Sequence, residues 1–524
     1  MAKDIVKGML RRLRSCAGFI GLCFVATVIV PGHGEMALAA QPVRGGTLTV
    51  GVDLDFRGFD PLKAKYLQIG DRSVAMAIEE RLFDLDAKGK FIPELALSAK
   101  PAKDGKSWTI KLRKGVSFHD GTPFTAVAVM EHWQRILDPQ NRFPGASLIE
   151  PVLGVSRVDD FTVRFDLKHP WAAFKDVIGG TQWIGAYIPS PKAVRADIQD
   201  RAPVGTGPYV LKEWLANDRL VVVRNPNYWR KGKAYLEKVV FRPIPDMQAI
   251  YAALKSGEAD IILTDRGASI QQAREDRSLK VYAGDGPGPY TFILNTAKPP
   301  LNDARVRRAL AHAWNQDFLL KADYKGTLPL AKDPFGTSLS CGDVGYREYD
   351  PAKARKLLAE YGKPVEIELL GTNTPRGREA GEIMQRLFKE VGVTLKLTPL
   401  ATGQMVKRVM GGDYQLSGWR MMDYNDMGPY LYMTEYSSGK QNYNNYRDPR
   451  LDELLTTQQT STDPKVRKKA LCEVARVINE EALHLYGGGR RVHFIAKASI
   501  QGIAGVDQGV IRVSDIWLNG AGKK

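Results

Sequence analysis

Hydrophobic and polar residues alternate along several short stretches of this chain, as expected for strands with one buried face. The clearest example is KSWTIKL at 106–112, in which Trp108, Ile110 and Leu112 fall on the same side. GGTLTVG at 45–51 follows the same pattern. Both stretches therefore predict short strands of sheets.

The stretch 203–229, PVGTGPYVLKEWLANDRLVVVRNPNYW, contains two runs of β-prone residues behind a glycine-rich turn. Gly205 and Gly207 can adopt positive φ, and Pro208 fixes its own φ. A short polar segment separates the two runs. We predict a β-hairpin with a rigid start, and the pattern by itself favours a structural role for it.

After Asp350 the hydrophobic residues first follow helical spacing and then alternate with polar ones, and the same order occurs a second time. Asp350 and Pro351 predict the start of a helix that Gly362 ends, and an alternating run begins at Val365. A second helical run and a second strand, which begins at Val393, follow. This order predicts a βαβ unit and hence parallel sheet.

Thr125 predicts the N-cap of a helix that follows a turn at Asp120-Gly121. His119 and His132 flank this start, but isolated histidines in such places are most often structural. The pattern also predicts helices from Asp246 to Lys255, from Asn302 or Asp303 to Trp314, from Arg450 to Gln458 and from Asp463 to Leu483, and strands at 159–166, 261–263 and 414–417.

The first forty residues differ in kind from the rest. Five basic residues precede an apolar run at 15–30, and Ala37-Leu38-Ala39 follows it. These three parts predict a secretory signal peptide at 1–40, cleaved after Ala39 or Ala40. The alternative is a membrane anchor, but an apolar run that ends before Pro31 is short for a span of about 20 residues.

Charge changes the picture little once export is assumed. The predicted signal peptide contains five basic and two acidic residues, so it carries +3 of the formal net charge of +17 and leaves +14. Basic and acidic residues are interleaved along the chain, and an exported protein meets no genome. We therefore expect a solvated basic surface that steers the protein toward anionic membranes or partners, and no nucleic-acid partner.

Of the four cysteines, Cys341 and Cys472 lie outside the predicted signal peptide. They form either one disulfide or two separate buried thiols. The motifs GxxxxGK[ST], GxSxG and HExxH do not occur in the sequence, and the seven histidines are scattered. We expect no enzyme activity and no cofactor; a secreted hydrolase with two dispersed carboxylates is the remote alternative.

Eight short motifs occur in the order known from one protein family. They are GGTLTVG, FHDGTPF, PVGTGPY, NPNYW, LKSGEADI, DARVRRAL, DPAKARKLL and YRDPRLDELL. With these motifs the chain resembles the family 5 bacterial solute-binding proteins, which are extracytoplasmic receptors of ABC importers for peptides and nickel. The resemblance implies an α/β fold of three domains in two lobes, the type II periplasmic binding protein of the large peptide-receptor subclass, with a hinge between the lobes.

The resemblance also implies domain boundaries. Domain I is expected to be discontinuous, at 41–80, 195–288 and 494–524, with domain II at 81–194 and domain III at 289–493. The chain is then expected to cross between the lobes at 284–289 and 487–491, which are both rich in glycine.

The stretch 418–427, GWRMMDYNDM, is the expected ligand segment. In peptide receptors of the family a GW..D motif places its Asp against the ligand's α-amino group, and the matching residue here is Asp423. Trp419 matches the family's tryptophan, a flat apolar wall with one donor. The expected ligand-binding residues are Gly418, Trp419, Arg420, Asp423 and Tyr424.

Two features narrow the expected ligand. Dipeptide receptors hold the ligand carboxylate with an arginine at the position of Gly371, so strict dipeptide recognition is not expected; Arg376, Arg378 or Arg420 are candidates for the cation. Met421 and Met422 suggest an adaptable wall, although one of them equally suits the core.

The resemblance implies a monomeric periplasmic receptor that captures a peptide or peptide-like solute between closing lobes and delivers it to a membrane ABC permease complex. Alternatives within the family are a nickel chelate, an opine, glutathione or an oligosaccharide.

Overall fold

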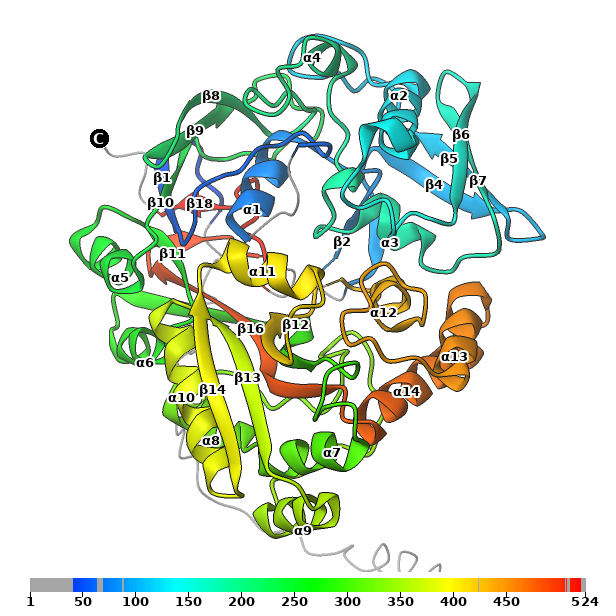
Figure 1. The fold of residues 1–524 in the computed structure, drawn as a ribbon. Coiled ribbons are helices and arrows are strands. Elements are labelled where there is room, and N and C mark those ends of the chain that lie inside the picture. The colour runs from blue at the N-terminus through cyan, green and yellow to red at the C-terminus, as the bar shows by residue number, and fades with distance from the viewer. Residues whose placement is uncertain are drawn as a thin grey trace, which may run out of the picture. The chain divides into compact units, whose positions relative to one another are not determined.

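A ten-stranded mixed sheet organises most of the chain in the computed structural model (Figure 1). Its strand order is β14-β13-β15-β12-β16-β11-β1-β10-β9-β8. The strands are β1 (Thr47–Val52), β8 (Tyr209–Leu215), β9 (Arg219–Arg224), β10 (Lys238–Pro243), β11 (Ile261–Thr264), β12 (Leu279–Leu294), β13 (Val365–Thr372), β14 (Val393–Leu400), β15 (Leu416–Arg420) and β16 (His484–Lys497).

The structure describes residues 41–63, 69–86, 89–422, 424–504, 506 and 509–519. The described residues from Pro42 onward belong to one compact unit. The predicted signal peptide at 1–40 lies outside the described residues.

The long strands β12 and β16 run antiparallel to each other through the middle of the large sheet. The N-terminal half of β12 pairs with the C-terminal half of β16, which in turn pairs with β11. The C-terminal half of β12 pairs with β15 and with the N-terminal half of β16. The register shifts between Asp285 and Pro289. The two glycine-rich stretches 284–289 and 487–491 therefore lie side by side where the pairing is irregular.

The predicted βαβ unit is confirmed. Helix α9 (Pro351–Tyr361) begins where Asp350 accepts a hydrogen bond from the Lys353 amide, and Gly362 ends it with a φ of 74°. Strands β13 and β14 pair in parallel, with α10 (Pro375–Lys389) between them in the sequence and packed against both. Parallel pairing requires such a crossover, so the hydrophobic pattern alone is enough to predict it.

A separate four-stranded antiparallel sheet lies in the upper right of Figure 1. It consists of β4 (Ala96–Pro101), β5 (Ser107–Leu112), β7 (Thr162–Leu167) and β6 (Val152–Asp159), and α2 (Ala126–Leu137) packs against β6 and β7. The predicted strand at 159–166 is wrong in its bounds, because the turn between β6 and β7 falls within it.

The two histidines that flank the start of α2 bond to backbone oxygens. His119 Nε2 lies 3.0 Å from the Gly207 oxygen, and His132 Nε2 lies 2.7 Å from the Gly185 oxygen. Both contacts join parts of the chain that are far apart in sequence, which is the structural role that the sequence predicts.

The predicted hairpin at 203–229 is confirmed as β8 and β9, but the expected reason for its glycines is wrong. Gly205 and Gly207 are not among the glycines with positive φ. A Cβ on Gly205 would lie 2.2 Å from the Ile78 oxygen, and one on Gly207 would lie 2.6 Å from the Ile78 carbonyl carbon. Both positions need glycine because the chain passes directly over the end of α1 (Ile69–Ile78).

The remaining elements complete the fold. The other helices are α3 (Phe174–Gly179), α4 (Pro191–Arg195), α5 (Met247–Ser256), α6 (Gly267–Glu275), α7 (Ala304–Ala313), α8 (Gln316–Ala322), α11 (Thr402–Met410), α12 (Gly428–Glu435), α13 (Pro449–Thr460) and α14 (Pro464–Glu480), with two short 3₁₀ turns (Pro139–Asn141 and Ile184–Ala186). The short strands are β2 (Phe83–Leu85), β3 (Phe91–Pro93), β17 (Ile500–Gln501) and β18 (Trp517–Leu518).

The structure decides between the two cysteine alternatives. Cys341, in the segment between α8 and α9, forms a disulfide with Cys472 on α14. The bond closes a loop of 131 positions.

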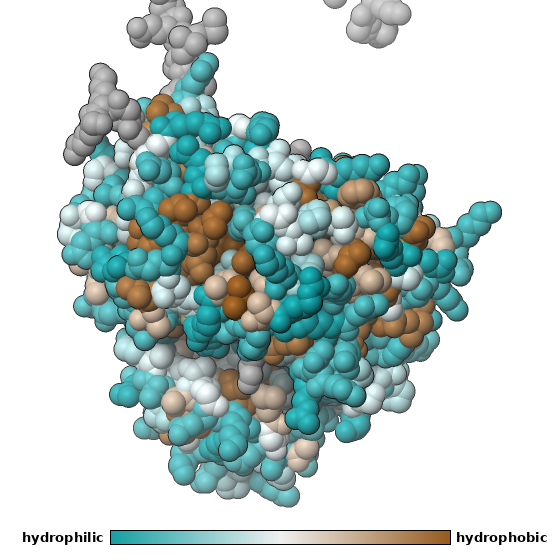
Figure 2. All heavy atoms as spheres, turned by 90° about the horizontal axis from the view of Figure 1, so that it is seen from above, coloured by the Kyte–Doolittle hydropathy of each residue, from teal (hydrophilic) through white to brown (hydrophobic). Residues whose placement is uncertain are grey.

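The surface shows no single dominant apolar area on the face seen from above, where separate hydrophobic patches lie among hydrophilic side chains (Figure 2). Among the described residues, no helix has the length and apolar character needed to cross a membrane.

Candidate functional site

The predicted ligand segment lies partly in a strand and partly in the loop after it. Gly418, Trp419 and Arg420 belong to β15, which runs from Leu416 to Arg420 and so ends later than the predicted strand at 414–417. The strand pairs with β12, and Tyr290 stands opposite Arg420. Asp423 lies outside the described residues.

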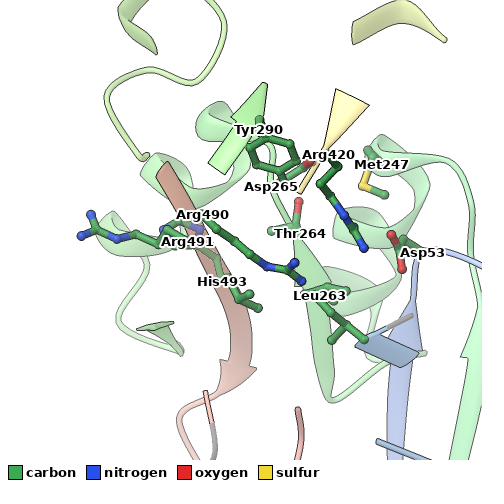
Figure 3. A pocket seen from close by; sticks show the side chains of 12 residues that line it. Asp53, Met247, Leu263, Thr264, Asp265, Tyr290, Arg420, Arg490, Arg491 and His493 are labelled. Carbon is green, nitrogen blue, oxygen red and sulfur yellow. The ribbon is translucent and has the colours of Figure 1, made fainter. Parts of the chain in front are cut away.

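One cavity beside β15 is lined mainly by polar and charged side chains, and we call it the polar cavity (Figure 3). Its volume is about 240 Å³. Its polar lining consists of Asp53, Thr264, Asp265, Tyr290, Arg420, Arg490, Arg491 and His493. These residues come from the end of β1, the end of β11, β12, β15 and β16, so the cavity forms only when segments from both halves of the large sheet meet.

Arg420 and Asp53 both line the polar cavity. Figure 3 shows Arg420 extending from β15 toward Asp53. Among the residues that the structure describes, neither side chain forms an ion pair. Burial raises the pKa of Asp53, nearby Asp265 raises it further, and Arg420 opposes this effect from a distance. Among the described residues, the lining of the polar cavity therefore includes Arg420 and Asp53 without a direct ion pair, together with Arg490.

Other charges around the polar cavity are compensated. Arg491 donates to Asp285 at 2.8 Å and points away from the space that Arg420 enters (Figure 3). Asp265 accepts a hydrogen bond from Arg376. The Cζ atom of Arg376 also lies over the Tyr324 ring, 4.5 Å from its centre. Arg376, a predicted candidate for the ligand cation, is therefore already engaged.

Of the other two candidates for the ligand cation, Arg420 lines the polar cavity. Arg378 is exposed on α10 and is not part of this lining.

His493 is the most deeply buried polar group of the cavity. Its side chain is fully enclosed, at 0% exposure, and neither ring nitrogen has a hydrogen-bond partner among the described residues. Burial lowers its pKa to about 4, with contributions from Arg491 and Arg274. The ring is therefore neutral at neutral pH and offers one donor and one acceptor.

A second cavity also borders the ligand segment, and we call it the apolar cavity. Its volume is about 510 Å³. The ligand segment and the elements after it contribute Trp419, Met422, Tyr424, Tyr430, Met433 and Tyr443, and the facing side contributes Arg142, Pro144, Gly145 and Leu148. Arg420 lines both cavities.

The structure separates the five predicted ligand residues. Trp419 and Tyr424 line the apolar cavity and Arg420 lines both cavities, whereas Gly418 lines neither. A Cβ on Gly418 would lie 3.8 Å from the Phe292 ring, so its place is in the packing of the sheet. The two methionines also differ, because Met422 lines the apolar cavity and Met421 is 1% exposed in the core.

The residues that face the ligand segment were missed by sequence reasoning. Arg142 and Leu148 follow α2, and Asp53 follows the first strand. No motif marks them; the positive φ of Arg142, 49°, is a backbone feature that the sequence does not reveal. Among the described residues, no group of three or more His, Cys, Asp or Glu side chains is arranged to hold a metal ion.

Comparison with known proteins identifies the family. Residues 90–442 match the family described as "Bacterial extracellular solute-binding proteins, family 5 Middle". The chain belongs to this family, as its motifs predict. At the level of the family these are solute-binding proteins rather than enzymes.

Two relatives and one solved structure illustrate the likeness. A glutathione-binding protein of Pectobacterium atrosepticum is 30% identical over 74% of this chain and 75% of its own length. A probable di/tripeptide-binding protein of Pseudomonas aeruginosa is 28% identical over 89% of this chain and 94% of its own. The periplasmic binding protein DppA of Helicobacter pylori, in complex with the peptide STSA, superposes with a TM-score of 0.81 at 24% identity, covering 91% of this chain and 99% of that one. The α/β fold of a periplasmic binding protein is thereby confirmed.

Proposed function

We propose that this protein is the periplasmic substrate-binding component of an ABC importer, and that it captures a peptide or peptide-like solute for delivery to the membrane permease complex. Membership of the family supports this function. The observation that carries the proposal for the site is the position of Arg420, which lines a polar and an apolar cavity at once. A ligand that enters both cavities needs a charged part and an apolar part, as a small peptide has.

The proposed mechanism is closure of two lobes about the middle of β12 and β16. Domain I comprises 41–80, 195–288 and 494–524, domain II 81–194 and domain III 289–493. The stretches 284–289 and 487–491 act as the hinge, because irregular pairing and glycine allow the backbone to change its φ and ψ there. The protein acts as a monomer in the periplasm after cleavage of its signal peptide and binds no nucleic acid.

Asp423 is the proposed partner of the ligand's amino group, and Trp419 and Tyr424 are proposed as walls for its apolar side chains. The names of the two relatives point to glutathione and to di- and tripeptides as the first ligands to test. Removing one partner of a carboxylate–ammonium pair in a closed cleft weakens binding by about 2–5 kcal/mol.

The test begins with mass spectrometry of small molecules released when the purified protein is denatured, followed by calorimetry with the released compound, glutathione and tripeptides. We expect a bound peptide-type compound and no turnover. Asp423→Asn should weaken binding by at least about tenfold, whereas Asp218→Asn, in the exposed turn between β8 and β9, should not. Unchanged affinity in Asp423→Asn would remove Asp423 from the site, and product formation from the ligand would contradict the binding-only function.

A further inference from the structure

After β15 the ligand segment continues at 421–427, which we call the ligand loop. At the end of this loop Asp426 accepts hydrogen bonds from two guanidinium nitrogens of Arg467 on α14, each at 2.6 Å. Met422 and Tyr424, which come earlier in the loop, line the apolar cavity. A contact from α14 therefore bears on one wall of this cavity.

The position of Arg467 is fixed by further contacts with α13. Its Nε donates to the Gln458 backbone oxygen at 3.0 Å, and its Nη2 lies 3.3 Å from the Gln458 side-chain oxygen. The side chains of Arg467 and Asp426 are 16% and 13% exposed, and Gln458 is fully buried. A planar fork that engages both carboxylate oxygens fixes their direction as well as their distance, and shielding from water strengthens such a contact.

The same group of contacts includes the start of α12. Asp426 Oδ1 accepts a hydrogen bond from the Gly428 amide at 2.9 Å, and the Gly428 oxygen accepts one from Gln458 Nε2 at 3.1 Å. A Cβ on Gly428 would collide with the Gln458 side-chain oxygen, so the backbone passes directly against α13 at this point. Helix α12 also carries two residues that line the apolar cavity, Tyr430 and Met433.

A second acid lies near this ion pair. Asp176 on α3 shares the lining of a small cavity with Tyr424 and Asp426. Burial raises the pKa of Asp176 well above its ordinary value, Asp426 raises it further, and Arg467 opposes this effect. One guanidinium thus faces two carboxyl groups. Without Arg467 the two carboxyl groups would lose the cation that compensates them, and their repulsion would favour movement of the loop end away from α3.

We propose that Arg467, which lines neither the polar nor the apolar cavity, is a positioning residue of the binding site. From α14 it holds the ligand loop and the start of α12 in the place where their side chains form a wall for the apolar side chains of the ligand. This inference rests on the proposed function and adds a residue that determines specificity without contact to the ligand. Dispersion attraction falls steeply when a gap opens, so a small displacement of the wall is enough to reduce selectivity.

The binding test compares trileucine with trialanine by calorimetry on the purified protein freed of bound ligand. The two tripeptides have the same length and the same charged ends, and they differ only in their apolar side chains. We expect the wild type to bind trileucine at least about tenfold more tightly, because each additional buried CH₂ group favours binding. Arg467→Gln should reduce this preference to less than about threefold. A residue that only stabilises the fold would leave the preference of the folded protein unchanged.

Hydrogen exchange of the ligand-free protein tests the positioning without any ligand. Peptides that cover 421–433 should exchange at least about threefold faster in Arg467→Gln than in the wild type, at a temperature at which thermal melting shows both proteins to be folded. Peptides that cover β13 and β14 should exchange at the same rate in both.

Two further variants complete the comparison. Arg450→Gln is the matched control, because Arg450 on α13 forms exposed ion pairs with Glu473 and Glu480 of α14; it should keep the preference and the exchange rates of the wild type. Arg467→Lys keeps the charge but loses the planar fork, so its preference and its exchange should lie between those of the wild type and of Arg467→Gln. If Arg467→Gln does not fold, Arg467→Lys serves for both measurements.

Unchanged exchange across 421–433 after replacement of Arg467, or a preference for trileucine that survives this replacement, would overturn the inference. Equal affinity of the wild type for the two tripeptides would also overturn it. In each of these cases the proposed function stands as long as peptides bind. If no peptide binds and none is released from the purified protein, the proposed function is wrong and the inference is wrong with it.

Discussion

Two groups of charged side chains in this protein differ in whether other protein groups pair with them. In the first, which we call the paired cluster, Glu80, Arg81, Asp84 and Arg512 have protein partners. Arg81 and Arg512 both donate to Asp84, the latter at 2.9 Å through Nη2. Glu80 accepts hydrogen bonds from Thr206 and Tyr228 at 2.8 Å and from Trp229 at 2.6 Å. The last three residues belong to the signature stretch 203–229, so this stretch encloses the paired cluster.

In the second group, the polar cavity, Arg420 and Asp53 remain without charged partners among the described residues. The two acids show the difference in their pKa values. Burial raises the pKa of both, but at Asp84 the neighbouring Arg81 and Arg512 outweigh burial and lower the pKa below its ordinary value. At Asp53 burial prevails and the pKa is raised. The protein pairs the first group of charges itself, whereas under the proposed function Arg420 is available to a ligand.

The largest effect is expected from breaking the paired cluster. Arg81→Met removes a guanidinium whose side chain is 1% exposed and leaves Asp84 and Glu94 without one of their partners. Removing one member of a buried ion pair costs about 3–5 kcal/mol. Urea unfolding of the ligand-free protein measures this loss. Arg157→Met, which breaks an exposed ion pair with Asp160, is the control and should cost less than about 1 kcal/mol; equal losses in the two variants would contradict the structural role of the cluster.

An intermediate effect is expected from pH. Two buried histidines show the same contrast, because His132 bonds to a backbone oxygen and His493 has no hydrogen-bond partner among the described residues. His132 donates from Nε2 to the Gly185 oxygen, and burial lowers its pKa to about 4, with a smaller contribution from Arg135. The ordinary pKa is near 6.5, so below this pH the unfolded chain binds a proton that the folded protein does not. The stability that neutral His132 provides is complete above pH 6.5 and decreases as the pH falls toward 4.

His132→Gln isolates this contribution, because every other titrating group is common to both proteins. Relative to the variant, the wild type should lose roughly 3 kcal/mol of unfolding free energy between pH 7 and pH 4. Urea midpoints at several pH values measure the difference. Parallel pH curves for the two proteins would show that His132 titrates normally in the folded state.

The smallest effect on stability is expected from replacing Arg420, which is a proposed ligand-binding residue. Arg420→Met makes the same substitution as Arg81→Met, but it removes a cation that has no ion-pair partner among the described residues. Replacing such a charge should change the unfolding free energy of the ligand-free protein by no more than about 0.5 kcal/mol. A loss comparable with that of Arg81→Met would place Arg420 among the structural charges.

The sequence predicted the elements whose signals are local. The helix from Pro351, the parallel strands from Val365 and Val393, and the hairpin at 203–229 follow from spacing, caps and turn residues within short windows. The ligand segment was predicted from a family motif, and its residues Trp419, Arg420 and Tyr424 do line cavities. The end of β15 was predicted too early, because pairing with β12 extends the strand through Arg420.

Only the tertiary structure decided which other segments of the chain these elements contact. Gly205 and Gly207 look like turn glycines, yet they are needed because α1, more than a hundred positions earlier, passes against them. Asp53 and Leu148 become cavity residues only when distant segments are brought opposite β15. Local patterns record which face of an element is buried, whereas close approaches, the partner of a charge and the space between segments depend on contacts across the whole chain. The sequence therefore determined the family, the elements and the segment that lines the cavities, and the folded chain decided which charges are paired among the described residues.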